Sequence, residues 1–243
     1  MIKAAFFDLD DTLCDDTGAW IACSRKAAAK GVATLAGNVD AEEVAQRFLA
    51  ISERYWMGLD YTTETRPLHE LRASQFAEAL GEAGITDYGR AHEVMAAEYS
   101  RIRSREIALF PDALSTLDGL RGLGVHLTMI TNGLASTHVE KVAHLGLEAA
   151  FDQVIIAGVI DLWKPDPRIF AHALDICRAE PHEAIMVGDN IVNDVGGAQR
   201  SGIPAFWYNP RGLAAGAGDP VPQLGELRAL RDMFDNGLEF GVA

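Results

Sequence analysis

Cysteine, positive charge and long apolar runs are all scarce in this 243-residue sequence. Its three cysteines, Cys14, Cys23 and Cys177, form neither a CxxC pair nor an even set, which excludes a disulfide framework and favours a reducing compartment. Lysine and arginine total 21 against 35 acidic residues, and a net charge of −14 argues against a nucleic-acid partner. No run approaches the length of a membrane span or a signal peptide, so we expect no membrane partner and a cytoplasmic location.

Apolar residues are plentiful, at 49% of the chain, and they are arranged in short runs. Five β-rich runs read as strands buried on both faces, at 2–8, 125–131, 153–158, 184–189 and 203–208. Helical patterns at 112–121, 134–145, 167–178 and 192–201 lie between or beside them. Strands that alternate with helices of this length predict an α/β fold with a Rossmann-like parallel sheet.

The interval between the first and second strands departs from this alternation. It contains four helical patterns, near 18–36, 40–57, 68–82 and 88–104, and no convincing strand. We therefore predict a core domain formed by 1–14 and 105–243, with a helical domain at 15–104 inserted into it. A surface loop at 212–222 and a last helix near 223–234 complete the predicted core.

Polar residues follow the predicted strands at their carboxyl ends, where open parallel sheets bind ligands. The groups are Asp8, Asp10 and Thr12; Thr131, Asn132 and Gly133; Lys164 in "WKPDPRIF"; and 188–194, "GDNIVND". Each alone has an ordinary interpretation, as a turn, a helix cap or a surface lysine. Their placement on successive strand ends favours a single reactive site.

These motifs, "DLDDT", "ITNG", "KPDPRIF" and "GDNIVND", resemble the four motifs of the haloacid dehalogenase superfamily, in the usual order. The helical insert resembles that of the helical-cap subclass. The motif sequences are most similar to those of the small-molecule phosphatases of the superfamily, among them pyrimidine nucleotidases and acylneuraminate phosphatases. The resemblance implies a Rossmann-like core and a cap domain that closes over the site.

The resemblance also implies a role for each motif residue. Asp8 is the expected nucleophile, which forms an aspartyl-phosphate intermediate, and Asp10 is the expected general acid and base. Lys164 is expected to be catalytic and to bind the phosphate. Two carboxylates 4 Å apart repel each other by about 4 kcal/mol at a dielectric constant of 20, so crowding by Asp8 predicts that Asp10 keeps its proton near neutral pH.

A divalent cation is expected because a phosphate dianion would be repelled by ionised carboxylates, and Mg²⁺ is the natural choice for oxygen ligands. The resemblance implies that the metal binds the side chains of Asp8 and Asp189 and the main-chain carbonyl of Asp10. Asp194 is expected to orient a metal-bound water or to hold Lys164. Thr131 and Asn132 are expected to bind phosphate oxygens at a strand-to-helix junction.

The predicted function is therefore a Mg²⁺-dependent phosphomonoester hydrolase acting on a small metabolite such as a nucleotide or sugar phosphate. A 2-haloacid dehalogenase is an alternative, although the resemblance implies a non-acidic residue in that branch at the position of Asp10. A phosphomutase also stays open, as does a catalytically silent binding protein on the same fold. The physiological substrate, the pathway and the oligomeric state are left open by the sequence.

Several aromatic or cationic residues of the insert are candidates for contacts with the substrate: Trp20, Arg54, Tyr55, Trp56, Tyr61, Arg66 and Arg72. We expect the aromatic ones to pack inside the insert and the arginines to be solvated. The seven histidines show no close metal-ligand spacing, and we expect structural or exposed roles for all of them.

Overall fold

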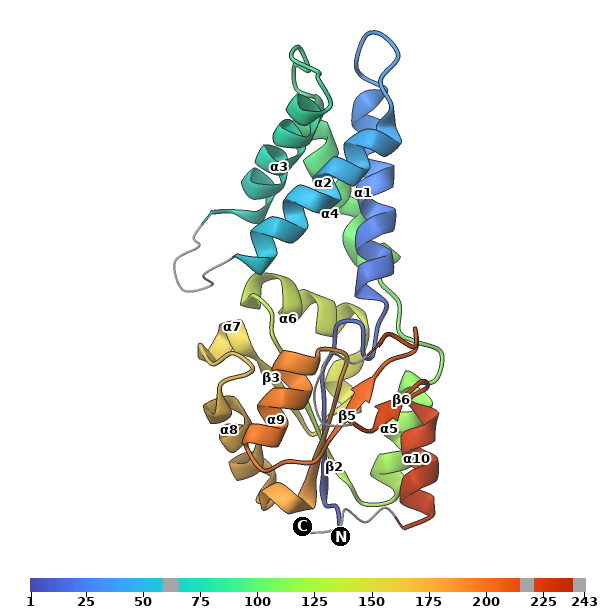
Figure 1. Ribbon diagram of the computed structural model, residues 1–243, viewed down its shortest axis with the longest axis vertical. Coiled ribbons are helices and arrows are strands. Elements are labelled where there is room, and N and C mark those ends of the chain that lie inside the picture. Colours follow the sequence, from blue (N-terminus) through green and yellow to red (C-terminus); the bar gives the residue numbers. More distant parts are fainter. Residues whose placement is uncertain (59–65, 215–220, 238–243) are drawn as a thin grey trace. The chain divides into compact units, whose positions relative to one another are not determined.

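The computed structural model describes residues 1–58, 66–214 and 221–237, and the chain divides into two compact units. The core unit comprises Met1–Asp15 and Leu109–Ala243, and it contains the strands of the described residues. The helical unit comprises Asp16–Ala108 (Figure 1). Its last helix, α4, extends to Glu106, so the predicted boundary at 104/105 falls within that helix.

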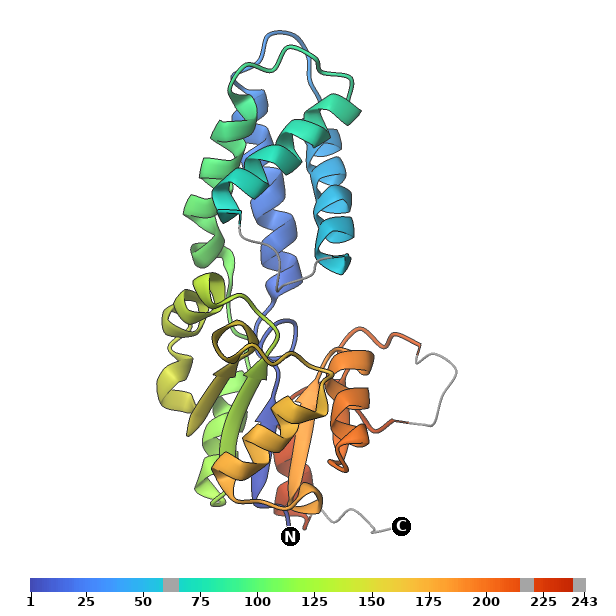
Figure 2. The same cartoon turned by 90° about the vertical axis from the view of Figure 1, so that its left-hand side faces the viewer.

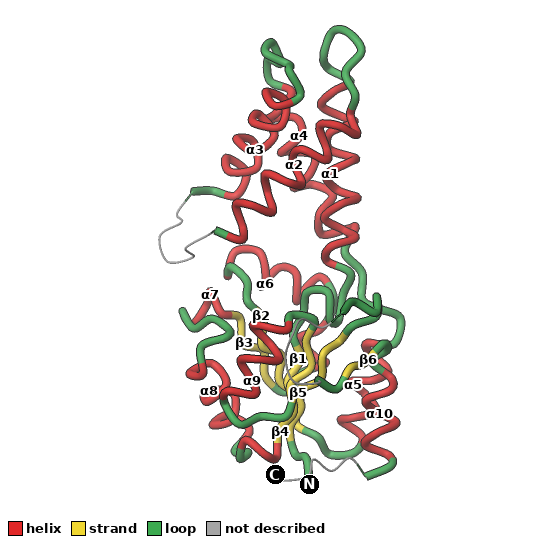
Figure 3. Tube along the Cα trace, in the orientation of Figure 1, coloured by secondary structure: helices red, strands yellow, loops and turns green. Residues whose placement is uncertain are grey.

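The core unit is built on a parallel sheet, which confirms the predicted α/β fold. In spatial order the strands are β3 (Gln153–Ile156), β2 (His126–Thr131), β1 (Ala4–Phe7), β4 (Ala184–Gly188), β5 (Ala205–Tyr208) and β6 (Gln223–Leu224). All neighbouring pairs are parallel, and the sheet is drawn in yellow in Figure 3. Phe7 at the end of β1 is in register with Val187 of β4, so the residues that follow these two strands lie side by side at the carboxyl edge.

Helices cover both faces of the sheet. Alternate residues of β1, Ala4 and Phe6, belong to an apolar cluster that includes α8 (Pro167–Cys177) and α9 (Gly196–Arg200). On the other face, where Ala5 and Phe7 point, lie α5 (Ala113–Gly122) and α10 (Arg228–Asp235) (Figure 1). Because both faces are covered, the strands have continuous apolar runs rather than alternating ones.

Short elements connect these layers. They are α6 (Ala135–His144) after β2, a 3₁₀ turn at Leu147–Ala150, α7 (Ala157–Ile160) after β3, a 3₁₀ turn at Pro181–Glu183, and a π-helical turn at Ile191–Val195 that leads into α9. The predicted helix at 192–201 is thus two elements. The Asn190 side chain caps the π-helical turn by accepting hydrogen bonds from the main chain of Val192 and Asn193.

The predicted last helix is wrong at its start. Gln223 and Leu224 form β6 instead, because the edge of β5 donates main-chain hydrogen bonds from Trp207 to Pro222 and from Asn209 to Leu224. The helix, α10, begins only at Arg228. Of the loop predicted at 212–222, residues 215–220 lie outside the described residues.

The helical unit contains the four helices that the sequence predicts, with ends shifted by a few residues. They are α1 (Asp16–Val32), α2 (Ala41–Met57), α3 (Leu68–Glu82) and α4 (Ala91–Glu106) (Figure 2). Each packs against two others, so the apolar faces enclose one cluster in which the rings of Phe48 and Phe76 stack 3.8 Å apart. In the part of the chain that is described, no helix has both the length and the apolar character of a membrane span.

Candidate active site

Two loops meet at the carboxyl ends of β1 and β4. Asp8 follows β1 and donates its main-chain N–H to Val187 of β4, at 2.9 Å. Asp189 follows β4, and its main-chain N–H donates to the Thr12 hydroxyl at 3.0 Å. On its other side, the Trp207 indole donates to the Asp189 carbonyl at 2.8 Å. The register of two parallel strands and these side-chain bonds therefore fix both aspartates at one edge of the sheet.

Lys164 lies between two carboxylates. Its ammonium is 2.6 Å from Asp8 Oδ1 and 2.6 Å from Asp194 Oδ1, and all three side chains are buried. Burial alone would lower the pKa of Lys164, but Asp194 and Asp8 outweigh burial and raise it. Lys164 is therefore a permanent positive charge that orients Asp8.

Asp194 is held in place by both of its oxygens. Oδ1 pairs with Lys164, and Oδ2 accepts a hydrogen bond from the main-chain N–H of Asn190 at 3.0 Å. A Cβ atom at Gly188 would lie 2.3 Å from Oδ2, so glycine is required there to leave room for the carboxylate. Asp194 thus supports Lys164 rather than facing solvent.

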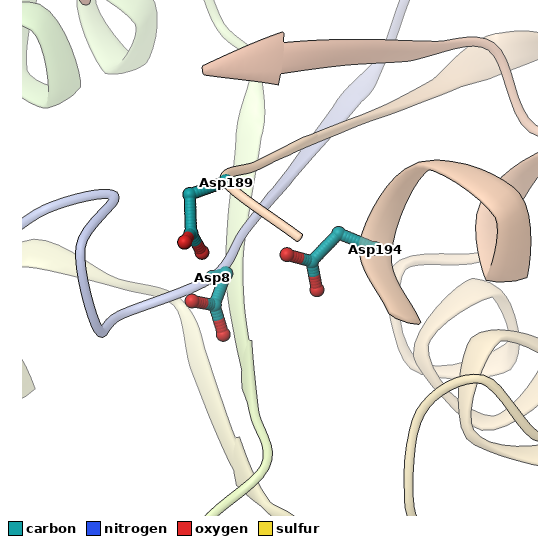
Figure 4. A group of neighbouring side chains, drawn as sticks. All are labelled: Asp8, Asp189 and Asp194. Carbon is teal, nitrogen blue, oxygen red and sulfur yellow. The ribbon is translucent and has the colours of Figure 1, made fainter. Parts of the chain in front are cut away.

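Three carboxylates, those of Asp8, Asp189 and Asp194, come close enough to share a metal ion (Figure 4). One oxygen of each lies within 4.8 Å of the others. Burial raises the pKa of Asp8 well above its ordinary value, and burial followed by Asp194 raises the pKa of Asp189 to about 7. A single lysine does not balance this much negative charge, and the oxygen donors fit a hard divalent cation. The main-chain carbonyl of Asp10 as a further ligand stays a prediction.

The two predicted phosphate-binding residues are at the end of β2. Thr131 is buried in the strand. The Asn132 side chain forms two hydrogen bonds with the main chain of Lys164: Nδ2 donates to the carbonyl at 2.7 Å, and Oδ1 accepts from the N–H at 2.8 Å. The carboxamide therefore positions the lysine segment, and phosphate binding by either residue stays a prediction.

The structure contradicts the expected state of Asp10. The Asp10 carboxylate is paired with two residues of α6, Lys141 and His138. These partners, rather than crowding by Asp8, determine its protonation state. Burial alone would raise the pKa of Asp10, but Lys141 and His138 outweigh burial and lower it below its ordinary value. Asp10 is therefore ionised in this structure, not protonated as the sequence led us to expect.

Sequence reasoning missed both partners of Asp10. His138 was expected to be structural or exposed along with the other histidines, and Lys141 was given no role. Both lie on a helix that begins just after a strand whose carboxyl end carries site residues. Their i, i+3 spacing places them on one face of that helix, and this was the signal available in the sequence.

The candidate substrate residues of the insert lie within the helical unit, apart from Tyr61, which is outside the described residues. Arg54 pairs with Glu78 on the surface, as expected of a solvated arginine. Arg72 differs, because its guanidinium lies 4.8 Å from the centre of the Tyr99 ring and donates to Ser100. Contacts of these residues with a substrate stay a prediction, as does the role of the helical unit as a cap.

The site thus consists of a buried lysine between two aspartates at the carboxyl edge of the parallel sheet of an α/β protein. The family model of the haloacid dehalogenase-like hydrolases matches residues 2–202 of the sequence, and the chain belongs to this family. The resemblance seen in the motifs is therefore confirmed, and the chain is a hydrolase.

Curated relatives are phosphatases by name. A phosphoserine phosphatase from Thermus thermophilus is 40% identical over 163 residues, which cover 67% of this chain and 64% of that protein. A glyceraldehyde 3-phosphate phosphatase from Methanothermobacter thermautotrophicus is 33% identical over 86% of each chain. Human N-acylneuraminate-9-phosphatase is 29% identical over 96% of this chain and 95% of its own length.

Solved structures share the fold over nearly the whole chain. The HAD hydrolase YfnB from Bacillus subtilis has a TM-score of 0.74 at 19% identity, covering 96% of this chain and 99% of that one. A 2-haloacid dehalogenase from Pseudomonas syringae has a TM-score of 0.63 at 29% identity, covering 98% and 100%. Phosphatases and dehalogenases are thus both among the similar proteins, and the residues of the site must distinguish them.

Proposed function

We propose that this chain is a phosphomonoester hydrolase that acts on a small phosphate ester through a covalent intermediate on Asp8, with Mg²⁺ as cofactor. The observation that carries the proposal is the pair of aspartates at the end of β1. Asp8 is buried against Lys164, and Asp10 is separately anchored by α6. Two carboxylates with different environments support two different roles in one reaction. The names of the curated relatives support the same class of substrate.

Asp8 is the nucleophile in this proposal. Lys164 holds Oδ1, which leaves Oδ2 to attack phosphorus and displace the alcohol oxygen. Lys164 also lies where its charge can stabilise the phosphoryl oxygens as the transition state forms. Asp194 keeps the lysine in place through its 2.6 Å contact.

Asp10 is the proposed proton carrier. A bound phosphoryl group brings negative charge close to Asp10, which raises the pKa of its carboxyl towards that of a proton donor. The protonated carboxyl then gives its proton to the leaving alcohol. The resulting carboxylate takes a proton from the water that hydrolyses the aspartyl phosphate.

The metal would be held by the side chains of Asp8 and Asp189, and Asp194, whose oxygens contact Lys164 and Asn190, would support the lysine instead. When bound, Mg²⁺ would supply the positive charge that lets a phosphate dianion approach ionised aspartates. Asp8, Asp189, Asp194 and the dianion together carry five negative charges, and Lys164 with Mg²⁺ balances three of them. Thr131 and main-chain N–H groups at the start of α6 are the proposed neutral donors.

Phosphate release from a panel of esters tests this proposal. The panel contains p-nitrophenyl phosphate, O-phosphoserine, glyceraldehyde 3-phosphate, N-acylneuraminate 9-phosphate and a set of nucleotides and sugar phosphates. We expect activity that needs Mg²⁺, is lost with EDTA, and falls about 10⁴-fold or more in Asp8→Asn. Asp118→Asn, which removes an exposed carboxylate of α5, is the control and should keep wild-type activity. Full activity of Asp8→Asn, or full activity in EDTA, would refute the proposal.

A 2-haloacid dehalogenase is the second candidate, and the likeness to the Pseudomonas syringae dehalogenase favours it. Displacement of halide needs no proton donor, so an anchored acid at Asp10 has no use in that reaction. Halide release from 2-chloropropionate in EDTA would support this candidate. We expect no such release.

A further inference from the structure

Asp10 is fixed by two cationic or polar side chains of α6. Lys141 Nζ donates to both carboxylate oxygens, at 2.7 Å to Oδ1 and 2.9 Å to Oδ2. His138 Nε2 lies 3.0 Å from Oδ2. The side chains of Lys141 and His138 are only 12% and 9% exposed, so this lysine is not a solvated surface group. The two α6 side chains are thus nearly buried, while the Asp10 side chain that they hold is 29% exposed.

The surroundings are shaped for the His138 ring. Its Nδ1 lies 3.0 Å from the hydroxyl of Thr137, which fixes the ring orientation. A Cβ atom at Gly133 would lie 2.0 Å from the ring, so only glycine at that position leaves the ring its place. Ring orientation and main-chain space both serve the contact with Asp10.

We propose that Lys141 and His138 are positioning residues that hold the Asp10 carboxyl in the orientation needed to pass its proton to the leaving alcohol. The inference rests on the proposed function and deepens it by adding two residues to its first half-reaction. Lys141 binds both oxygens at once, so the carboxyl plane is fixed rather than free to rotate. Oδ2 is contacted by both Lys141 and His138, whereas the second neighbour of Oδ1 is the weak thiol donor Cys14, at 3.8 Å. Oδ1 is therefore the oxygen that carries the proton, which moves from Asp10 to the alcohol oxygen as the P–O bond breaks.

A purely structural link between α6 and the loop after β1 would show the same contacts, so the test must depend on the chemistry. A p-nitrophenolate leaves without a proton, whereas the alkoxide of an alkyl ester needs one. Loss of a positioning residue should therefore slow alkyl esters more than p-nitrophenyl phosphate. A structural fault should slow both equally.

The experiment compares kcat/KM of Lys141→Met for p-nitrophenyl phosphate and for the best alkyl ester of the panel. This ratio reports on steps up to loss of the leaving group, so the later hydrolysis of the aspartyl phosphate does not mask the effect. We expect the alkyl ester to lose about 10- to 100-fold more than p-nitrophenyl phosphate, with partial recovery in Lys141→Arg. Glu140→Gln, an exposed neighbour on α6, is the matched control and should leave both values unchanged.

A double-mutant cycle shows whether Lys141 acts through Asp10. On the alkyl ester, Asp10→Asn with Lys141→Met should be no slower than Asp10→Asn alone. If circular dichroism shows Lys141→Met to be unfolded, His138→Gln gives the same comparison with Lys141 in place. Equal losses on both esters, or additive losses in the cycle, would overturn the inference while the proposed function stands. A wild-type protein that hydrolyses neither ester would overturn both.

Discussion

Asp189 shows how a single residue of the site opposes the stability of the fold. Burial and the nearby carboxylates of Asp194 and Asp11 raise its pKa to about 7, from an ordinary value of 3.8. Between these values the folded chain keeps the proton and the unfolded chain has released it. Raising the pH through this window therefore lowers the stability of the metal-free protein. The proposed role of Asp189 as a metal ligand and the stability of the fold therefore make opposite demands on this position.

Replacing Asp189 by asparagine should stabilise the metal-free protein at pH 8, on the order of 2 kcal/mol, because a half-buried negative charge beside other carboxylates is removed. The gain should shrink as the pH falls towards 5, where the wild-type carboxyl is protonated in the folded state. Urea unfolding in EDTA at several pH values measures both effects. Asp118→Asn is the control for removing a surface carboxylate. A gain that does not change with pH, or a loss at pH 8, would contradict the argument.

At the scale of elements, the helical unit depends on the close approach of α1 and α4. A Cβ atom at Gly31 of α1 would lie 2.2 Å from the Met95 side chain and 2.9 Å from the main-chain oxygen of Ala91. The methionine side chain could adjust, but the main chain of α4 could not do so without moving the helix. Gly31 therefore sets the distance between these two helices.

Gly31→Ala should cost about 1–3 kcal/mol of stability through overpacking. Gly81→Ala is a matched control, since Gly81 is also the second-last residue of its helix but has no atom within 4 Å of the added methyl group. It should be neutral or stabilise by up to about 1 kcal/mol, as expected of alanine in a helix. Thermal unfolding of both variants makes the comparison. Equal effects of the two substitutions would show that the spacing of α1 and α4 is not tight.

The sequence could predict those elements whose own residues carry a clear pattern, and it could not predict those that depend on contacts with other elements. The strands with apolar runs were predictable because burial on both faces leaves a continuous signal, as in β1 and β4. Gln223 and Leu224 carry no such signal and become a strand only because β5 offers them hydrogen bonds. The π-helical turn before α9 was likewise hidden, since it depends on the cap from Asn190.

The site divides in the same way. Motif residues and strand order were enough to predict that Asp8, Lys164 and Asp194 share one edge of the sheet. The state of Asp10 was predicted wrongly because only its neighbour Asp8 was considered. The contacts of Lys141 and His138 with Asp10 depend on side-chain geometry and on the space left by Gly133. Neither can be predicted from the order of strands and motifs in the sequence.

At the scale of the whole molecule, the chain has two separate apolar interiors. One lies between the sheet and α8 and α9, and the other lies among the four helices of the helical unit. The chain passes between the units at two points, after Asp15 and after Ala108. Units with separate cores can unfold separately, so a single free energy of unfolding need not describe the protein.

Calorimetry should accordingly resolve two transitions. Mg²⁺ should raise the temperature of the one that belongs to the core unit, because a ligand stabilises only the state that binds it. Phe76→Ala, which removes half of the stacked pair with Phe48, should lower the other transition and leave the Mg²⁺ effect intact. A single transition that responds to both changes together would show that the two units unfold as one.

The hydrogen bond from the Trp207 indole to the main-chain carbonyl of Asp189 has an optical consequence. The ring is almost fully buried, so solvent contributes little to its emission, and its one polar atom senses the loop that carries a candidate metal ligand. A small displacement of that carbonyl changes the electric field along the indole and hence its excited state. Trp207 is therefore a chromophore within the chain, one of its four tryptophans, that is hydrogen-bonded to the loop of Asp189 and can report on that loop without any added label.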